Sequence, residues 1–170
     1  MNRTLSHALL LIGTASFLAC ADQALIPDAV EVRPGLFVLQ GAPDRDTFGA
    51  LRAAGVTQVL NLRTEAEGEA TGDAAQATSA GAAYGRCPMD REPSAAALDQ
   101  FRAQLKALPK GSRVLLHCAS GNRVGGALLT AWVLDEGMDP TQALVLAKKA
   151  GLRNPATEKA AQAYIALRRK

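Results

Sequence analysis

A short loop that contains cysteine, glycine and arginine, residues 117–123 with the sequence HCASGNR, constrains the fold of this 170-residue chain more than any other segment. The apolar run Val114-Leu115-Leu116 precedes the loop and predicts a strand, and the apolar stretch 124–134 follows it and predicts a buried helix. A strand, a tight loop and a helix bring successive loop amides and the positive end of the helix to one point, where an anion binds.

The side chains of this loop suit nucleophilic chemistry on a bound oxyanion. The field of the loop favours the thiolate form of Cys118, which is the nucleophilic form. Arg123 offers a planar fork of donors that matches two oxygens of a phosphate or a similar anion. A buried structural cysteine is the alternative, but it does not account for Gly121 at a tight turn or for Arg123 at a helix start. We therefore predict a nucleophile beneath an anion-binding cradle.

The rest of the chain alternates between strand and helix patterns. Pro34-Gly35 predicts the turn of a hairpin. Ser94 is expected to cap a helix that ends at Pro109-Lys110-Gly111. This alternation predicts a three-layer α/β fold with a mostly parallel central sheet that is covered on both faces. The predicted strands are 30–32, 36–39, 56–62, 82–87 and 113–117, and the predicted helices are 46–54, 73–81, 94–108, 124–134, 140–151 and 155–168.

The N-terminus has the pattern of an export signal. Arg3 supplies a positive charge, and the uncharged, mostly apolar run of 12 residues from Ala8 to Ala19 follows it. This run is shorter than the roughly 20 residues that a membrane-spanning helix needs, so it predicts a cleaved signal peptide rather than an anchor. We therefore divide the chain into a signal peptide at 1–21, a linker at 22–29 and one folded domain at 30–170, located outside the cytoplasm and expected in the periplasm.

Two cleavage sites fit this signal. The segment 17–20, Phe-Leu-Ala-Cys, resembles a bacterial lipobox and would leave Cys20 lipidated at the new N-terminus, with Phe17 where leucine is typical. The segment 19–21, Ala-Cys-Ala, fits the rule of small residues around a cleavage site and would give a soluble protein that starts at Asp22. Contact with a membrane is expected only through such a lipid.

Composition excludes several other classes of protein. A net charge of +3 and an aromatic content of 4% give no basic patch or stacking platform for nucleic acid. Three cysteines are too few for a disulfide framework and lack metal-ligand spacing, and His117 is the one histidine outside the signal. We therefore expect neither a metal nor an organic cofactor, while the oligomeric state has no signature in the sequence.

The pattern His-Cys-x-x-Gly-x-Arg after an apolar strand resembles the phosphate-binding loop of the protein tyrosine and dual-specificity phosphatase superfamily. Segments 32–40 and 46–62, with Ala54-Gly55-Val56 and Asn61-Leu62-Arg63, are similar in order and spacing to the bacterial phosphatase-like domain of beta-lactamase-hydrolase-like proteins. The resemblance covers about residues 30–151. It implies that Cys118 is the nucleophile and Arg123 the phosphate ligand. The substrate-binding donors that it implies are the backbone amides of Ala119, Ser120, Gly121, Asn122 and Arg123.

The loop departs from most members of that superfamily in two ways. Four residues separate Cys118 from Arg123, where most tyrosine phosphatases have five. A shorter loop is typical of rhodanese-like sulfurtransferases, in which the cysteine carries a persulfide, and also occurs in some bacterial phosphatase-like domains. Val124 stands where many phosphatases have a hydroxyl residue that assists breakdown of the phosphocysteine, which predicts slow turnover.

The resemblance also suggests a general acid. Asp90 lies 28 positions before Cys118 in the loop after a predicted strand, where members of the superfamily carry their acid, and Glu92 is the substitute. A turn aspartate beside prolines is the alternative interpretation. His117 is expected to position the cysteine backbone through its ring. Cys87 is expected to pack as a small apolar residue, and the alternative is that it pairs with Cys118 under oxidising conditions.

The preferred function is therefore hydrolysis of a phosphate ester through a cysteinyl-phosphate intermediate. Sulfur transfer through a Cys118 persulfide and oxyanion binding without turnover are the two alternatives. The sequence does not identify the substrate beyond a phosphorylated molecule or another oxyanion.

Overall fold

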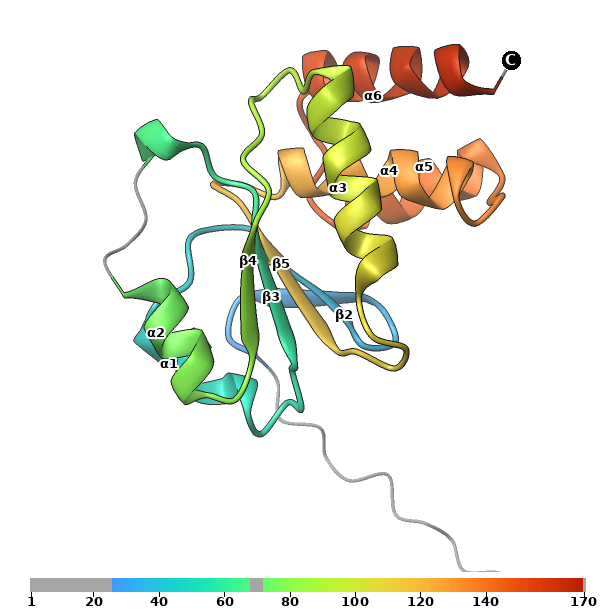
Figure 1. Cartoon of the computed structure of the whole chain (residues 1–170). Helices are drawn as coiled ribbons and strands as arrows, with labels where there is room; N and C mark the ends of the chain where they lie inside the picture. Colours follow the sequence, from blue (N-terminus) through green and yellow to red (C-terminus); the bar gives the residue numbers. More distant parts are fainter. Residues whose placement is uncertain (1–25, 68–71, 170) are drawn as a thin grey trace, which may run out of the picture.

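The computed structural model describes residues 26–67 and 72–169 and shows five strands, six α-helices and one 3₁₀-helix in that part of the chain (Figure 1). The predicted signal peptide lies outside these residues. The strands are β1 (Ala29–Arg33), β2 (Leu36–Leu39), β3 (Gln58–Asn61), β4 (Ala83–Arg86) and β5 (Val114–His117). The helices are α1 (Arg45–Leu51), η1 (Glu65–Glu67), α2 (Asp73–Ser79), α3 (Ala95–Ala107), α4 (Asn122–Leu134), α5 (Pro140–Lys149) and α6 (Pro155–Arg168).

The five strands form one sheet in the order β1-β2-β5-β3-β4. All neighbouring pairs are parallel except β1 and β2, which form the predicted antiparallel hairpin. Gly35 in the hairpin turn has a φ of 78°, a value that favours glycine. The central strand, β5, is buried at all four residues because parallel neighbours lie on both sides and helices cover both faces.

Helices cover the two faces of the sheet unequally, which makes the three layers of the predicted α/β fold. Figure 1 shows α1 and α2 on one face and α3 to α6 on the other. Because side chains alternate along a strand, Leu115 packs with Phe48 and Leu51 of α1, whereas Val114, Leu116 and Cys118 join the core beneath α4. The end of β5 therefore delivers Cys118 to the face that carries the longer helices.

Helix α4 is the central element of that layer, and eleven of its thirteen residues are buried. Two glycines allow the neighbouring segments to approach its backbone. A Cβ atom at Gly125 would lie 2.7 Å from the carbonyl oxygen of Ala147, and one at Gly126 would lie 2.9 Å from the Cγ2 atom of Thr157. This close packing brings the C-terminal end of α5 and the N-terminal end of α6 next to the cysteine loop.

The structure differs from the sequence predictions at two element boundaries. The pattern Asp73-x-x-Gln76 is typical of a capping box with Asp73 as the N-cap, but Gly72 occupies the N-cap position of α2 and Asp73 is the first helical residue, with its side chain buried. Ile26 was placed in the linker, yet it is buried against Phe37 and Leu39, and β1 begins at Ala29. The folded part therefore includes the last residues of the predicted linker.

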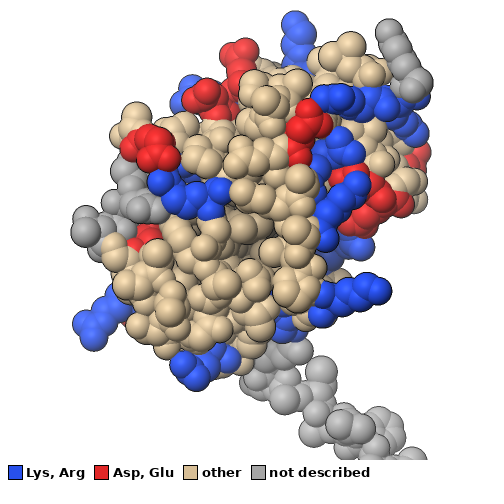
Figure 2. All heavy atoms as spheres, in the orientation of Figure 1, with Lys and Arg blue, Asp and Glu red and all other residues tan. Residues whose placement is uncertain are grey.

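No helix within the described residues is both long and apolar enough to cross a membrane. Figure 2 shows basic and acidic side chains interspersed over one face of the molecule, so the net positive charge is not gathered there into one large patch.

Candidate active site

The cysteine loop connects the buried end of β5 to the first turn of α4. Gly121 is the N-cap residue of α4, with a φ of 79°, and it provides no side-chain cap. A Cβ atom there would lie 2.6 Å from the carbonyl oxygen of Ala150, so both the conformation and the packing require glycine. The first amides of a helix have no partner within the helix, and here they converge on the loop. One of them, Gly121 N, donates to Cys118 Sγ at 3.2 Å.

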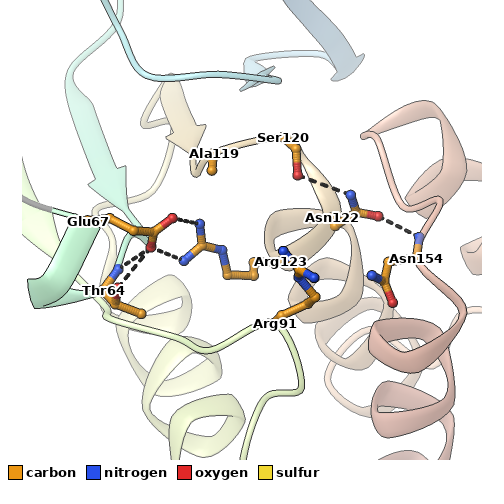
Figure 3. A pocket seen from close by; sticks show the side chains of 8 residues that line it. All are labelled: Thr64, Glu67, Arg91, Ala119, Ser120, Asn122, Arg123 and Asn154. Atoms are coloured by element: carbon orange, nitrogen blue, oxygen red, sulfur yellow. Dashed lines mark hydrogen bonds and ion pairs between the residues drawn. The ribbon is translucent and has the colours of Figure 1, made fainter.

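A cavity of about 500 Å³ opens beside this loop (Figure 3). Its wall comes from four places in the fold: the segment after β3, the loop between β4 and α3, the cysteine loop and the start of α6. The lining residues are Thr64, Glu67, Arg91, Ala119, Ser120, Asn122, Arg123 and Asn154. Cys118 does not reach this wall, because its side chain is fully buried.

Arg123 is held in a fixed orientation between the cysteine loop and the cavity. Its Nη1 and Nη2 atoms donate to Glu67 at 2.5 and 2.6 Å, and Nη1 also donates to the Met89 carbonyl at 3.0 Å and to the Leu62 carbonyl at 3.4 Å. The ion pair with Glu67 raises the pKa of Arg123, burial opposes this shift, and the charge of the nearby Cys118 sulfur adds to it. The guanidinium is therefore a permanent cation beside the sulfur.

In this orientation some N–H donors of Arg123 remain available for an anion. A guanidinium has five N–H donors. Glu67 takes one from each Nη atom, and the carbonyls of Met89 and Leu62 share the second one of Nη1. These four bonds leave the Nε donor and the second Nη2 donor, which form the side-on fork that matches two oxygens of a phosphate. The guanidinium also hydrogen-bonds with the Cys118 side chain, which adds to the rise in its pKa. Glu67 thus fixes the guanidinium and leaves one edge of it for an anion.

Glu67 is the site residue that the sequence analysis missed. The acidic, glycine-containing sequence 65–72 is typical of a surface loop, but Glu67 Oε2 accepts from Thr64 N at 2.8 Å, from Thr64 Oγ1 at 3.0 Å and from Arg123. Hydrogen bonding to Arg123 lowers the pKa of Glu67 to about 2, with Thr64 contributing in the same direction and burial opposing. The pattern Thr64-x-x-Glu67 is a capping-box sequence, which was the available signal.

The loop between β4 and α3 presents Arg91, not Asp90, to the cavity. The Met89 carbonyl accepts from Arg123, and the Arg91 carbonyl accepts from Thr157 Oγ1 at 2.7 Å. Hydrogen bonds therefore hold the backbone on both sides of Asp90. Asp90 and Glu92 are exposed and are not among the lining residues. The acid role of Asp90 therefore remains a prediction.

Asparagine side chains tie the cysteine loop to the start of α6. Asn122 Oδ1 accepts from the backbone amides of Arg153 at 2.7 Å and Asn154 at 2.6 Å, and its amide nitrogen donates to Ser120 Oγ at 3.1 Å. Figure 3 shows the contacts of Asn122 with Ser120 and Asn154 along one side of the cavity. Asn122, which was predicted only as a backbone donor, therefore also joins two elements with its side chain.

His117 is buried without the role that we predicted for its ring. Neither ring nitrogen has a hydrogen-bond partner within residues 26–67 and 72–169, so the ring does not hold the cysteine backbone. Burial, together with a smaller effect of the charge of Arg63, lowers the pKa of His117 to about 4. The side chain is therefore neutral near pH 7, and its lack of partners argues against a role as a base.

Cys87 fits its simpler interpretation as a buried apolar residue. It is a free thiol with no exposed surface, and burial raises its pKa to about 11. Cys87 follows β4 and Cys118 follows β5, with β3 between these strands. Two strand spacings amount to roughly 9–10 Å, which exceeds the roughly 7 Å limit between the Cα atoms of a disulfide. The fold therefore argues against a disulfide between them.

A metal site is not evident in the described part of the chain. No group of three histidine, cysteine, aspartate or glutamate side chains there could hold an ion. The groups that the cysteine loop brings together are one thiol, one fixed guanidinium and the amides at the start of α4.

Solved structures share this fold, although no protein-family model and no curated protein sequence matches the chain. A putative phosphatase (DUF442) from Shewanella putrefaciens has a TM-score of 0.69 at 24% identity, over 84% of this chain and 94% of its own. A TpbA variant from P. aeruginosa, in complex with pTyr, has a TM-score of 0.63 at 20% identity, over 81% and 82%. PTPMT1 in complex with PI(5)P has a TM-score of 0.67 at 17% identity, over 84% and 99%.

These likenesses define the class of fold. The chain has the fold of the protein tyrosine and dual-specificity phosphatases, as the cysteine loop and the order of the segments predicted. At this level of identity the comparison establishes the architecture, and the chemistry has to be argued from the residues of the site.

Proposed function

We propose that the protein hydrolyses phosphate monoesters through a cysteinyl-phosphate intermediate. The observation that carries the proposal is the position of Cys118: its sulfur accepts from Gly121 N at the start of α4 and lies beside the guanidinium of Arg123. A thiolate between helix amides and a fixed cation is stabilised in its reactive form. Solved neighbours in complex with pTyr and with PI(5)P add support, since both ligands are phosphate monoesters.

The proposed reaction has two displacements at phosphorus. The Cys118 thiolate attacks phosphorus, an S–P bond forms, and the P–O bond to the leaving group breaks with its electron pair on oxygen. In our proposal Asp90 gives this oxygen a proton. Water then attacks phosphorus and gives a proton to the Asp90 carboxylate, the S–P bond breaks with its electron pair on sulfur, and inorganic phosphate leaves with the thiolate and the protonated acid restored. The free edge of Arg123 and the loop amides bind the equatorial oxygens in both steps, where the charge develops.

Burial of the sulfur adds a requirement to this mechanism. Cys118 has no exposed surface, whereas the neighbouring Arg123 lines the cavity. A bound phosphate must therefore draw the guanidinium or the loop outward by enough for sulfur and phosphorus to meet. We expect phosphate to change the rate at which iodoacetamide alkylates Cys118, while Cys87, which is buried away from the cavity, reacts only on unfolding.

Oxyanion binding without turnover is the second candidate. Among the described residues that line the cavity, Glu67 is the only carboxylate, and with a pKa of about 2 it holds no proton to give. Asp90 lies outside the lining. If Asp90 does not reach the leaving group, esters of poor leaving groups would bind and stay intact.

A leaving-group series separates these candidates. We expect hydrolysis of aryl phosphates by the wild type and its loss in Cys118→Ser. In Asp90→Asn we expect the rate to fall about 10²–10⁴-fold for an alkyl phosphate, the range for general acid catalysis, and much less for p-nitrophenyl phosphate, whose leaving group needs no proton. Phosphate binding without hydrolysis of any ester would contradict the proposal. Thiosulfate conversion in the presence of cyanide, without phosphate release, would support sulfur transfer instead.

We also propose that this domain acts outside the cytoplasm, on the basis of the N-terminal pattern alone. The intact mass of the protein recovered from the envelope of an expressing bacterium tests this. A chain that starts at Asp22, or one that starts at Cys20 with acyl chains attached, supports export. A full-length cytoplasmic chain contradicts it.

A further inference from the structure

The cavity contains a second arginine whose charge the proposed hydrolysis does not use. Arg91 lines the same cavity as the cysteine loop, and Figure 3 shows its side chain pointing inward between Arg123 and Asn154. Its guanidinium has no ion pair or hydrogen bond with any of residues 26–67 and 72–169, although Asp90 and Glu92 are its chain neighbours. The two cavity arginines thus differ: Arg123 is paired with Glu67, and Arg91 has an uncompensated charge.

The backbone of Arg91 is fixed while its side chain is left open. Its carbonyl oxygen accepts from Thr157 Oγ1 at 2.7 Å, and Thr157 is fully buried where α6 packs on Gly126 of α4. Two residues earlier, the Met89 carbonyl accepts from Arg123. The Cα atom of Arg91 is therefore held in a constant position relative to the phosphate-binding edge of Arg123, and only side-chain rotations have to be ordered when an anion binds.

Asn154 adds a second donor on the same side of the cavity. Its Oδ1 atom accepts from the amides of Ala156 and Thr157, which caps α6 and leaves the amide nitrogen facing the cavity (Figure 3). That nitrogen has no acceptor among the described residues. Around Arg91 the wall therefore offers donors and a positive charge, whereas Glu67, the one lining carboxylate within residues 26–67 and 72–169, is already bound to Arg123.

We infer that the substrate carries a second anionic group beside the phosphate that reacts, and that Arg91 and the Asn154 amide bind this second group. The inference rests on the proposed function, because that function identifies the phosphate at the cysteine loop as the group that is hydrolysed. The expected class is a compact phosphate monoester with a neighbouring phosphate or carboxylate, because the cavity of about 500 Å³ has both cationic positions in one wall. Arg91 would then decide which esters bind rather than how fast the bond breaks.

Binding of non-hydrolysable anions tests the second site independently of turnover. By calorimetry on the full-length protein, we expect propane-1,3-diphosphonate to bind roughly tenfold to a hundredfold more tightly than methylphosphonate, the range for one added hydrogen-bonded charge pair. Arg91→Gln should reduce this preference to the statistical factor of about two, and Arg91→Lys should restore part of it. Arg45→Gln is the matched control, since Arg45 is also exposed but begins α1 and lies beside α2, away from this cavity.

Turnover forms the second arm of the experiment. With propane-1,3-diol bisphosphate as substrate, Arg91→Gln should raise KM about tenfold or more with a much smaller change in kcat. A wild-type preference of twofold or less, or a preference that Arg91→Gln leaves intact, would overturn the inference. If binding prefers the diphosphonate in a way that depends on Arg91 but the bisphosphate is not hydrolysed, the result would support the second anion site and contradict the proposed hydrolysis.

Discussion

The cysteine loop and the Thr64–Glu67 segment line one cavity but are held in place by different interactions. The loop is fixed by backbone geometry: Gly121 has a left-handed conformation, and the end of α5 packs within 2.6 Å of where a Cβ atom would lie. The segment 64–67 is fixed by side chains, through the bonds of Glu67 to Thr64 and to Arg123, a residue 56 positions further along the chain. We expect the backbone conformation at Gly121 to tolerate almost no substitution. Removing single side-chain bonds around Glu67 should instead lower stability and binding in small steps.

The largest effect is expected from Gly121→Ala. A left-handed conformation costs a residue with a Cβ atom about 1–2 kcal/mol, and the contact with the Ala150 carbonyl adds about 1–3 kcal/mol of overpacking. We expect a loss of about 3 kcal/mol in the free energy of unfolding, measured in urea, with loss of phosphate binding. Gly111→Ala is the control, since φ there is also positive but a Cβ atom meets nothing within 4 Å. Equal losses in both variants would show that packing on α5 does not support the loop.

The next effect is a pH dependence from His117. Its pKa is about 4 in the folded protein, against about 6.5 in an unfolded chain. Below pH 6.5 the unfolded chain therefore takes up a proton that the folded protein does not, so stability falls as the pH falls from 6.5 to 4. The shift corresponds to at most about 3 kcal/mol. Urea unfolding should show this slope in the wild type and lose it in His117→Leu, and an unchanged slope in that variant would assign it to other groups.

Glu67→Gln should have a smaller effect on stability and a larger one on binding. The Glu67 side chain is 31% exposed, so solvent screens the pair, and we expect a loss of about 1–2 kcal/mol in the free energy of unfolding. The pKa of Glu67 lies below its unfolded value near 4.5, so this contribution is present above pH 4.5 and is lost as the pH falls toward 2. The stability difference between wild type and Glu67→Gln should therefore shrink over that range.

Function provides the second measurement on the same variant. Glutamine keeps one acceptor oxygen, so the Arg123 guanidinium loses the ion pair and one of its two bonds to the side chain at position 67, while the Met89 and Leu62 carbonyls still accept from it. Its free edge then loses a fixed direction, so we expect phosphate affinity to fall about tenfold, which corresponds to ~1.4 kcal/mol. Tighter phosphate binding in Glu67→Gln would contradict this, because it would mean that Glu67 competes with the anion for Arg123.

The same contrast explains which parts were predictable from sequence. Cys118, Gly121 and Arg123 lie within six consecutive residues, and the strand and helix around them follow from local apolar patterns. Glu67 and Arg91 reach the cavity only because β3, β4 and β5 end at the same edge of the sheet, and sequence spacing does not encode that placement. His117 shows the opposite error, since its position beside the cysteine suggested a role that its burial without hydrogen bonds does not support.

The smallest effect is expected from Thr64→Val, which separates the two supports of Glu67. This change removes the hydroxyl bond to Glu67 Oε2 at 3.0 Å and retains the bond from Thr64 N at 2.8 Å and both bonds from Arg123. We expect a loss of about 1 kcal/mol in the free energy of unfolding and less than a threefold change in phosphate affinity. Ser94→Ala, which removes the cap of α3 far from Glu67, is a control of similar size for stability. If Thr64→Val instead weakens phosphate binding as much as Glu67→Gln does, the local capping box rather than the ion pair orients the carboxylate, and through it the arginine.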